Sequence, residues 1–218
     1  MATLLGRDFV VYDLIVLGGG PAGYHGANLA GKNGLQTLLL EKTALGGVCL
    51  NTGCIPSKTW LHAAKIYAEA KNGAAYGVRA EGISFDQRRA TARKNKVVKI
   101  LAAGIKNQLQ ENKVQVVAAK GEILGRDGTG FKVKAGEEYY IGKNLLIATG
   151  STPIIPPIPG LDTALREGKV LTNEEIYNLS RVPASLVVIG GGVIGLEMAA
   201  SFNGVGCRVT VIEMRNRI

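Results

Sequence analysis

The stretch "LIVLGGGPAGYHGANLAGKNGLQTLLLEK", residues 14–42, decides the fold because the chain repeats its pattern 172 positions later. The second copy reads "LVVIGGGVIGLEMAASFNGVGCRVTVIEM" and spans residues 186–214. The two copies align without a gap. Each begins with a short apolar run, passes through G-x-G-x-x-G into an alanine-containing helical stretch, and ends in a second apolar run and a glutamate. The repeat therefore predicts two strand–helix–strand units of the same kind.

The glycine spacing indicates what each turn binds. In a strand-to-helix turn of this kind the first glycine makes the turn, the second lets the backbone approach a pyrophosphate, and the third lets the helix pack on the strand. The positive end of the helix dipole then faces the phosphates, and the glutamate accepts hydrogen bonds from ribose hydroxyls. Two ordinary glycine-rich turns are the alternative, which a pair of copies in register disfavours. The residues concerned are Gly18, Gly20, Gly23 and Glu41 in the first copy and Gly190, Gly192, Gly195 and Glu213 in the second.

The fold class expected from this repeat is α/β, with a Rossmann-like domain over residues 1–152 that carries a small antiparallel excursion. The excursion is predicted from "VQVVAAKGEIL", "GFKVKAG" and "EYYIGKNLLIATG", which alternate apolar and polar residues between glycine turns. The proline-rich "STPIIPPIPG" predicts a linker. Residues 153–218 are then the linker and the first βαβ unit of a second Rossmann-like domain. Only 33 residues run from Leu186 to Ile218, so we expect the N-terminal half of a longer enzyme.

The composition is that of an ordinary globular protein, with 46% hydrophobic and 20% charged residues. We expect a cytosolic protein with no signal peptide, because the apolar run before Gly18 leads into a glycine motif and no run reaches the roughly 18 residues of a membrane span. Much of the net charge of +9 lies in residues 88–99, which begin a predicted amphipathic helix. That helix lacks aromatics for base stacking, which favours a solvated or partner-facing charged side over nucleic-acid binding.

The segment "GGVCLNTGCIPSK", residues 46–58, holds two of the three cysteines. A zinc site, a structural disulfide and a redox-active disulfide are the three possibilities. Metal ligation is disfavoured because His25 and His62 are the only histidines and are expected to be surface or packing residues. A structural disulfide across so short a loop removes little chain entropy, and the cytosol favours catalytic cysteines over structural ones.

The loop chemistry favours the redox-active disulfide. Gly53 supplies the backbone freedom to bring the sulfurs together, and Pro56 is expected to be the first residue of a helix. Cys54 then precedes the helix N-terminus, where the dipole and Lys58 stabilise a thiolate. Cys207 and Trp60 are expected to be core residues instead.

At this point the sequence resembles the pyridine nucleotide–disulfide oxidoreductases. "GGVCLNTGCIPSK" is similar to the redox-disulfide motif of that family, and "YDLIVLGGGPAGY" is similar to its FAD motif. "LLIATGSTP" resembles its second flavin-domain signature, "VVIGGGVIGLEMA" its NAD motif, and residues 92–114 its long flavin-domain helix. The resemblance runs from Tyr12 to Ile218 in the order of the family, and it is strongest to the branch that oxidises dihydrolipoamide.

The resemblance implies a role for each motif residue. Cys49 is the interchange thiol, Cys54 faces the flavin, and Lys58 lies near the flavin with Glu197 as its ion-pair partner. The implied FAD contacts are Gly18, Gly20, Pro21, Ala22, Gly23, Glu41, Lys42, Gly47, Val48, Lys58, Gly121, Thr149, Gly150 and Ser151. The implied NAD contacts are Gly190, Gly192, Val193, Ile194, Gly195, Glu197 and Glu213, and no metal is implied.

The resemblance also implies an activity and partners. Reduced lipoamide exchanges with a Cys49–Cys54 disulfide, and two electrons pass through FAD to NAD. Partners would be lipoyl-bearing subunits of 2-oxoacid dehydrogenase or glycine cleavage complexes, and the full-length enzyme would be a homodimer. Alternatives are a reductase of glutathione, coenzyme A disulfide or mercuric ion, or a non-catalytic FAD- and NAD-binding fragment. Glu213 favours NAD over NADP, although Arg215 and Arg217 lie close by.

Overall fold

The computed structural model describes residues 2–4 and 7–218, and it divides into two compact units. The first comprises Met1–Asn51 and Lys99–Thr152, and the second comprises Thr52–Val98 and Pro153–Ile218. The expected first domain begins at Met1, which lies outside the described residues. Its expected end at residue 152 coincides with a unit boundary, but residues 52–98 group with the second unit. Which cofactor belongs to which domain stays a prediction.

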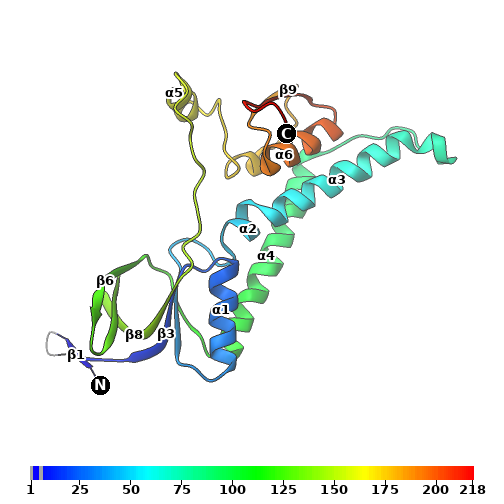
Figure 1. Ribbon diagram of the computed structural model, residues 1–218. Helices are drawn as coiled ribbons and strands as arrows, with labels where there is room; N and C mark the ends of the chain where they lie inside the picture. Colours follow the sequence, from blue (N-terminus) through cyan, green and yellow to red (C-terminus); the bar gives the residue numbers. More distant parts are fainter. Residues whose placement is uncertain (1, 5–6) are drawn as a thin grey trace. The chain divides into compact units, whose positions relative to one another are not determined.

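The first unit contains a six-stranded sheet in the order β5-β4-β3-β8-β7-β6 (Figure 1). Strand β3 pairs in parallel with both β4 and β8, β4 pairs in parallel with β5, and β6, β7 and β8 pair antiparallel. A separate antiparallel pair, β1 and β2, lies near the N-terminus. The strands are β1 Ala2–Leu4, β2 Arg7–Phe9, β3 Val11–Leu17, β4 Thr37–Leu40, β5 Gln115–Val117, β6 Gly121–Asp127, β7 Gly130–Ala135 and β8 Glu138–Ile147.

The antiparallel excursion that the sequence predicts is confirmed, with one correction. The segment "VQVVAAKGEIL" is not one strand, because β5 pairs in parallel with β4 and only β6 belongs to the antiparallel part. The chain turns between them, where the Ala119 N–H donates to the Val117 carbonyl at 3.0 Å. Strand β8 returns the chain to the centre of the sheet beside β3.

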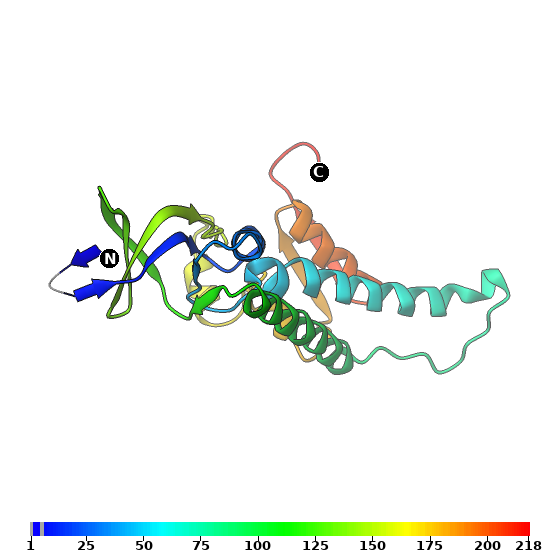
Figure 2. The same cartoon turned by 90° about the horizontal axis from the view of Figure 1, so that it is seen from below.

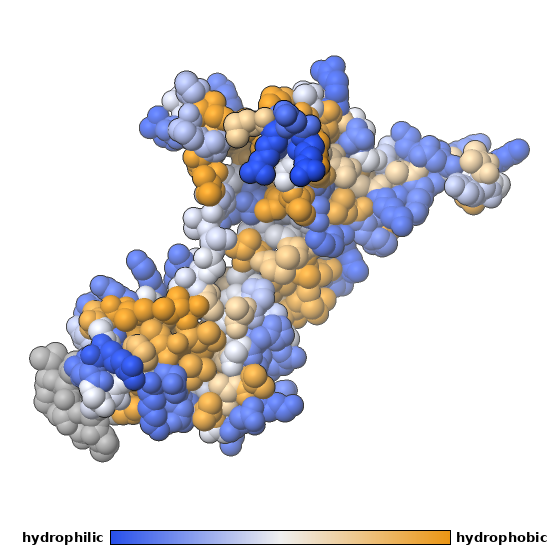
Figure 3. Space-filling model, viewed as in Figure 1, coloured by the Kyte–Doolittle hydropathy of each residue, from blue (hydrophilic) through white to orange (hydrophobic). Residues whose placement is uncertain are grey.

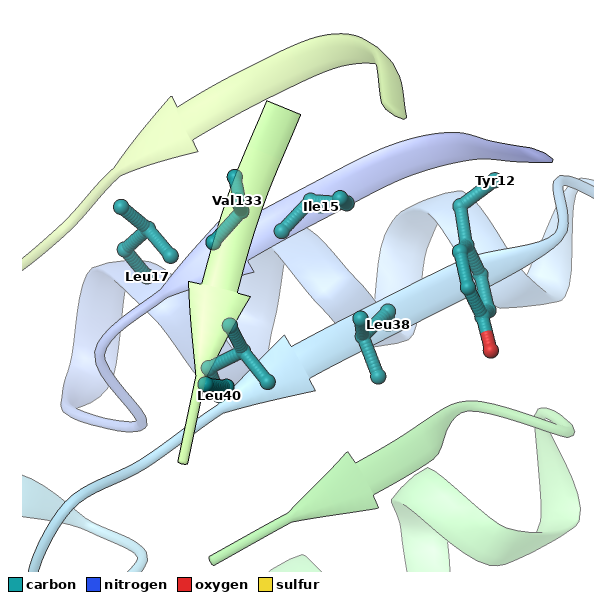
Figure 4. Close-up of a cluster of buried hydrophobic side chains, with 7 residues drawn as sticks. Tyr12, Ile15, Leu17, Leu38, Leu40 and Val133 are labelled. Carbon is teal, nitrogen blue, oxygen red and sulfur yellow. The ribbon is translucent and has the colours of Figure 1, made fainter. Parts of the chain in front are cut away.

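One helix of the first unit, α1 (Pro21–Lys32), packs on β3, β4 and β8 (Figure 1). The apolar core lies against the sheet and is closed by β7, whose Val133 packs among Ile15, Leu17, Leu38 and Leu40 (Figure 4). All four residues of β4 are buried, as expected for a parallel strand that is covered on both faces. These contacts fix the ends of β3 and β4, from which the first glycine turn and Glu41 project.

Apolar residues also gather at the surface of the first unit, in the lower left of Figure 3. That unit exposes Ile123, Leu124 and Ile147 by more than two fifths of their surface. Exposed apolar patches mark surfaces that contact a partner, a ligand or another part of a protein. This surface is therefore available for such contacts in addition to the folded core.

The second unit is built on α3 (Cys54–Asn72) and α6 (Val193–Gly204), which run side by side (Figures 1 and 2). They approach closely at Gly204, where a Cβ would lie 3.2 Å from the Ala64 Cβ. Parallel strands β9 and β10 precede and follow α6. The other elements are β9 Ser185–Ile189, β10 Arg208–Ile212, 3₁₀ turns η1 Gly73–Tyr76 and η2 Ile176–Asn178, and α5 Leu161–Arg166. The predicted linker is irregular from residue 151 to 158.

The core of the second unit is aromatic. Trp60 packs edge-on against Tyr177 at 5.3 Å and against Phe202 at 5.6 Å between ring centroids. Cys207 and Met198 belong to the same buried cluster. The expectation that Trp60 and Cys207 are core residues is confirmed.

The long basic helix α4 spans Gln87–Glu111, close to the predicted bounds. Of the apolar residues that recur every four positions in this helix, Ile105 and Leu109 are buried, whereas Leu101 is 42% exposed and Val97 is partly exposed, so the period predicts burial only in the C-terminal half. Lys94 departs from the expectation that the basic residues are solvated, because it is only 4% exposed. Its ammonium donates a hydrogen bond to the Tyr177 carbonyl at 3.2 Å, which is the physical reason a lysine is tolerated there. Among the described helices, none is long and apolar enough to cross a membrane.

We predict that Phe202→Ala destabilises the second unit by about 3 to 5 kcal/mol, because it leaves a cavity in a fully buried aromatic cluster. Urea denaturation measures the free energy of unfolding. The control is Ile66→Ala on α3, where the side chain is 53% exposed and the change should stay within about 0.5 kcal/mol. Equal effects of the two substitutions would contradict the assignment of this core.

Candidate functional site

The first glycine turn joins β3 to α1. Gly18 has φ +101°, and its N–H donates to the Leu40 carbonyl at 2.8 Å. A Cβ on Gly23 would lie 1.8 Å from the Gly18 carbonyl oxygen, so only glycine fits this position. Helix α1 begins at Pro21, and no described side chain caps its first turn. The backbone N–H groups of that turn are therefore left for an anionic ligand.

The second glycine turn repeats this geometry. Gly190 has φ +103°, and its N–H donates to the Ile212 carbonyl at 2.8 Å. A Cβ on Gly195 would lie 2.3 Å from the Gly190 carbonyl oxygen. Helix α6 also begins without a side-chain cap from any described residue, and its 12 residues match the 12 of α1. The internal repeat read from the sequence is thus a repeat of conformation.

A carboxylate holds each turn. Glu41 accepts the Gly19 N–H at 2.6 Å and the Thr43 N–H at 2.7 Å. Burial opposes ionisation of Glu41, but these donors outweigh it and lower its pKa. The carboxylate is therefore charged at neutral pH. It has about four acceptor positions, so it can also accept a ribose hydroxyl.

The equivalent carboxylate of the second copy is Glu213. It accepts the Gly191 N–H at 2.7 Å and the Arg215 N–H at 2.8 Å. The Arg215 N–H is the main cause that lowers the pKa of Glu213. Sequence spacing placed both acids after the second strand, and the structure shows that each also braces the glycine turn of its own copy.

Other predicted flavin residues lie at the first turn. The Gly46 N–H donates to the Gly19 carbonyl at 2.8 Å, and a Cβ on Gly47 would lie 2.7 Å from the Gly20 Cα. The segment after β8 lies against the same turn, since a Cβ on Gly18 would fall 3.1 Å from the Thr149 Cα.

The remaining predicted cofactor residues lie in loops or first helical turns, except Gly121, which is the first residue of β6. Gly121 packs on the ends of β3 and β4, where a Cβ would lie 2.6 Å from a Leu17 methyl. Gly150 has φ +71° and follows β8. The exposed members of the predicted set are Pro21, Ala22, Lys42, Val48, Lys58, Thr149, Gly150, Ser151, Gly192, Val193 and Ile194.

The cysteine segment differs from the predicted loop. Cys49 lies in a short helix, α2 (Gly47–Thr52), and Cys54 is the first residue of α3. The prediction that the helix begins at Pro56 is wrong, because α3 begins directly after Gly53. Gly53 has φ −144° and ψ −115°, which are not helical angles and therefore separate α2 from α3. A proline fits within the first turn because N–H groups there have no helical partner. Cys49 is half-buried and Cys54 exposed, and the disulfide between them stays a prediction.

The ion pair expected between Lys58 and Glu197 is present. The Lys58 ammonium donates to the Glu197 carboxylate at 2.7 Å, joining α3 to α6. This hydrogen bond is the main cause that raises the pKa of Lys58, and the charge of Cys54 adds to the rise. It is also the main cause that lowers the pKa of Glu197. A fixed positive charge therefore lies within electrostatic reach of the Cys54 sulfur.

Two residues that the sequence did not single out belong to this cluster. The Ser57 hydroxyl lies 2.6 Å from the Tyr177 hydroxyl, and both residues are buried. Ser57 lies inside the quoted cysteine motif, which could have drawn attention to it. Tyr177 lies in η2, and no motif marks it.

The described residues offer three chemical features. Two helix N-termini are uncapped and suited to phosphates, an exposed thiol lies at the start of a helix, and a lysine–glutamate pair lies beside that thiol. Such a set suits thiol–disulfide exchange coupled to nucleotide cofactors.

Curated relatives cover nearly all of this chain. It is 42% identical over 208 residues to the dihydrolipoyl dehydrogenase of Acholeplasma laidlawii, which covers 95% of this chain and 61% of that protein. It is 40% identical to the dihydrolipoyl dehydrogenase of Bacillus subtilis, covering 95% of this chain and 45% of that protein. The chain thus spans about half the length of the curated relatives it matches.

Solved structures agree with the fold. LpdA from Mycobacterium tuberculosis matches with a TM-score of 0.81 and 28% identity, over 94% of this chain and 45% of that one. The flavoprotein disulfide reductase RclA from Escherichia coli matches with a TM-score of 0.80 and 29% identity, over 94% and 43%. A family model described as pyridine nucleotide-disulphide oxidoreductase matches residues 12–218. This chain belongs to the pyridine nucleotide–disulphide oxidoreductase family.

Proposed function

We propose that this chain is part of an FAD-dependent enzyme that oxidises dihydrolipoamide and passes the electrons to NAD. The observation that carries the proposal is the Cys49–Cys54 segment, placed in the sequence between two glycine turns of the same spacing. The relatives named dihydrolipoyl dehydrogenase support this choice of substrate.

The first glycine turn fits the pyrophosphate of FAD. Gly23 lets the first turn of α1 lie close against the Gly18 carbonyl, and that turn is uncapped by the described side chains, so its backbone N–H groups are left for phosphate oxygens. Glu41 is held charged beside it and would accept the ribose hydroxyls of the adenosine. When bound, FAD supplies two-electron chemistry between a dithiol and a nicotinamide.

The second turn fits NAD on the same grounds. Gly195 lets the first turn of α6 lie close to the Gly190 carbonyl, and no described side chain caps that turn. Glu213 is charged and would accept both free ribose hydroxyls, whereas a 2′-phosphate there would meet like charge. The charge of this one residue supports NAD over NADP.

The cysteines would carry the exchange with substrate. A lipoyl thiolate attacks the Cys49 sulfur of a Cys49–Cys54 disulfide, forms a mixed disulfide and releases the Cys54 thiolate. The second lipoyl thiol attacks the lipoyl sulfur of the mixed disulfide, which closes lipoamide and releases the Cys49 thiol. Two electrons and two protons of the dithiol are thereby transferred to the cysteine pair. Lys58, paired with Glu197 at 2.7 Å, lies one helical turn after Cys54 in α3.

The partners and location follow from this substrate. Dihydrolipoamide is carried on lipoyl-bearing subunits of 2-oxoacid dehydrogenase or glycine cleavage complexes, so those subunits are the proposed partners. We propose a homodimer for the complete enzyme and a cytoplasmic location. A disulfide reductase with another substrate is the second candidate, supported by the likeness to RclA.

The first prediction is an assay of the complete enzyme. Dihydrolipoamide with NAD⁺ should be turned over far faster than glutathione disulfide with NADPH, because the cysteine segment suits exchange with a lipoyl dithiol and Glu213 favours NAD⁺ over NADP⁺. The measurement is kcat/KM for each pair. A faster reaction with glutathione disulfide favours the second candidate, and no reaction with either favours a non-catalytic nucleotide-binding protein.

The second prediction separates the two thiols. Cys49→Ser should abolish exchange with dihydrolipoamide but leave the Cys54 thiolate beside bound FAD. The long-wavelength absorption band that a thiolate gives beside bound FAD should therefore persist at neutral pH in Cys49→Ser and be lost in Cys54→Ser. Cys207→Ser is the matched control, because that thiol is buried in the core of the second unit. Loss of the band in Cys49→Ser with FAD bound would reverse the two roles.

The third prediction concerns cofactor choice. Glu213→Ala should weaken the use of NAD⁺ and relax the discrimination against NADP⁺, because the ribose acceptor and the repulsive charge are removed together. Arg215 and Arg217 would then be free to meet the 2′-phosphate. The measurement is the ratio of kcat/KM for the two cofactors. The equivalent change in the first copy, Glu41→Ala, should leave that ratio unchanged in enzyme that retains FAD.

An unchanged ratio in Glu213→Ala, or a wild-type preference for NADP⁺, would show that the cofactor is chosen by other contacts. The control matters because both acids brace their glycine turns. A shift that appears in both variants would reflect a loosened fold instead of lost recognition.

A further inference from the structure

The break between α2 and α3 is restrained on its first side by a distant part of the chain, residues 172–179, which we name the bracing segment. Its Asn173 side-chain amide donates to the Thr52 carbonyl at 3.2 Å. Thr52 is the last residue of α2, and the carbonyls at the end of a helix have no donor within that helix. Because a peptide group is planar, this hydrogen bond restrains the whole group that joins Thr52 to Gly53.

The second side of the break is restrained at the peptide group that joins Gly53 to Cys54. The Ser57 N–H donates to the Gly53 carbonyl at 2.9 Å, and the Tyr177 hydroxyl donates to the same carbonyl at 3.5 Å. The Tyr177 hydroxyl also lies 2.6 Å from the Ser57 hydroxyl. The number of protons allows both contacts, because the serine can donate to the phenol oxygen while the phenol donates to the carbonyl. The nitrogen of this planar peptide group belongs to Cys54.

The bracing segment is itself fixed by other parts of the second unit. The buried Lys94 ammonium of α4 donates to the Tyr177 carbonyl at 3.2 Å, and the Thr91 hydroxyl of the same helix donates to the Leu179 carbonyl at 3.3 Å. Trp60 packs edge-on against the Tyr177 ring, which is 1% exposed. The two side chains that reach the break therefore project from a backbone that α4 holds in place.

The two restrained peptide groups meet at the Cα of Gly53, so their relative orientation is the φ −144° and ψ −115° of that residue. Glycine has more backbone freedom to lose than any other residue, and the local sequence alone leaves these two angles free. A disulfide between Cys49 and Cys54 closes a ring that contains both peptide groups. Closing that ring costs less conformational entropy when the groups within it are already ordered.

We propose that Asn173 and Tyr177 are positioning residues for Cys54, which lower the cost of closing the Cys49–Cys54 disulfide by restraining the two peptide groups at Gly53. Both residues act on the backbone that leads into Cys54, so they set its direction without taking part in the exchange. The inference rests on the proposed function only in that the two cysteines form a redox-active disulfide. It does not depend on which dithiol is oxidised or on which nicotinamide cofactor is used.

The test is a redox titration of the complete enzyme with dithiothreitol, carried out without oxygen. Reduced dithiothreitol gives two electrons and two protons to the Cys49–Cys54 disulfide, which opens to two thiols, and dithiothreitol becomes its own cyclic disulfide. Mixtures of reduced and oxidised dithiothreitol set the potential. Alkylation of the free thiols and mass spectrometry of the peptide that contains both cysteines then measure the fraction of enzyme that is oxidised.

In Asn173→Ala and in Tyr177→Phe the equilibrium constant for forming the disulfide should fall about tenfold, because one restraint at Gly53 is lost. For a two-electron couple this moves the redox midpoint by about 30 mV to a less negative potential. The double variant should shift little further than either single variant, since the loss of one restraint already releases Gly53.

The matched controls are Asn178→Ala, at an exposed asparagine of the bracing segment, and Tyr67→Phe, which removes a hydroxyl from another tyrosine of the second unit. Their redox midpoints should equal that of the wild type. An unmoved midpoint in Asn173→Ala or Tyr177→Phe, a shift to more negative potential, an equal shift in the controls, or additive shifts in the double variant would overturn the proposal. If Tyr177→Phe does not fold, the half-buried Asn173 decides alone through Asn173→Ala.

The outcomes separate this inference from the proposed function. Dithiothreitol replaces the substrate, so the result stands whether or not dihydrolipoamide is oxidised. A wild type that forms no Cys49–Cys54 disulfide at any ratio of the reagent would overturn both, whereas a disulfide whose midpoint does not move in the variants overturns the inference alone. A purely structural role would lower the thermal stability of the oxidised and reduced enzyme alike and leave the redox midpoint in place, which also contradicts the proposal.

Discussion

The structure depends on one close contact, which is made twice. The first turn of a helix lies so near the preceding glycine turn that a Cβ on Gly23 or Gly195 would overlap a carbonyl oxygen. The helix can therefore start directly at the end of its strand, with its N–H groups aimed outward from the sheet edge. In both copies the strands before and after the helix pair in parallel, β3 with β4 and β9 with β10. Strand, helix and strand are then placed together in each copy.

The glutamate at the end of each copy holds the conformation of its glycine turn, and the same carboxylate is suited to accept hydrogen bonds from ribose. The carboxylate accepts a backbone N–H from the second residue of its own turn, so a group suited to ribose also braces the loop that approaches the phosphates. One side chain thus couples loop rigidity to recognition. This double role explains why both copies have the acid although the sequences of their helices differ.

The thiol segment shows how a single glycine organises a reactive site. Gly53 ends one helix and starts another, so the two cysteines lie on separate helices that need not share an axis. The second helix then carries Ser57 and Lys58 on its first turns, where they meet Glu197 of α6 and the phenol of Tyr177. A local backbone break and a buried tyrosine from a distant segment therefore act on the same few atoms.

The sequence by itself determined those parts of the structure whose conformation depends on residues that are neighbours in the chain. Glycine spacing, alternating apolar residues and the acid after each second strand predicted both nucleotide turns, the antiparallel excursion and the long helix, because backbone conformation there depends on nearby residues. The Lys58–Glu197 pair was predicted only through the family resemblance. Tertiary structure alone decided that Lys94 is buried, that α3 begins at Cys54, and that Tyr177 meets Ser57 across 120 positions. Burial and long-range hydrogen bonding depend on which segments pack together, and no periodicity in the chain encodes that.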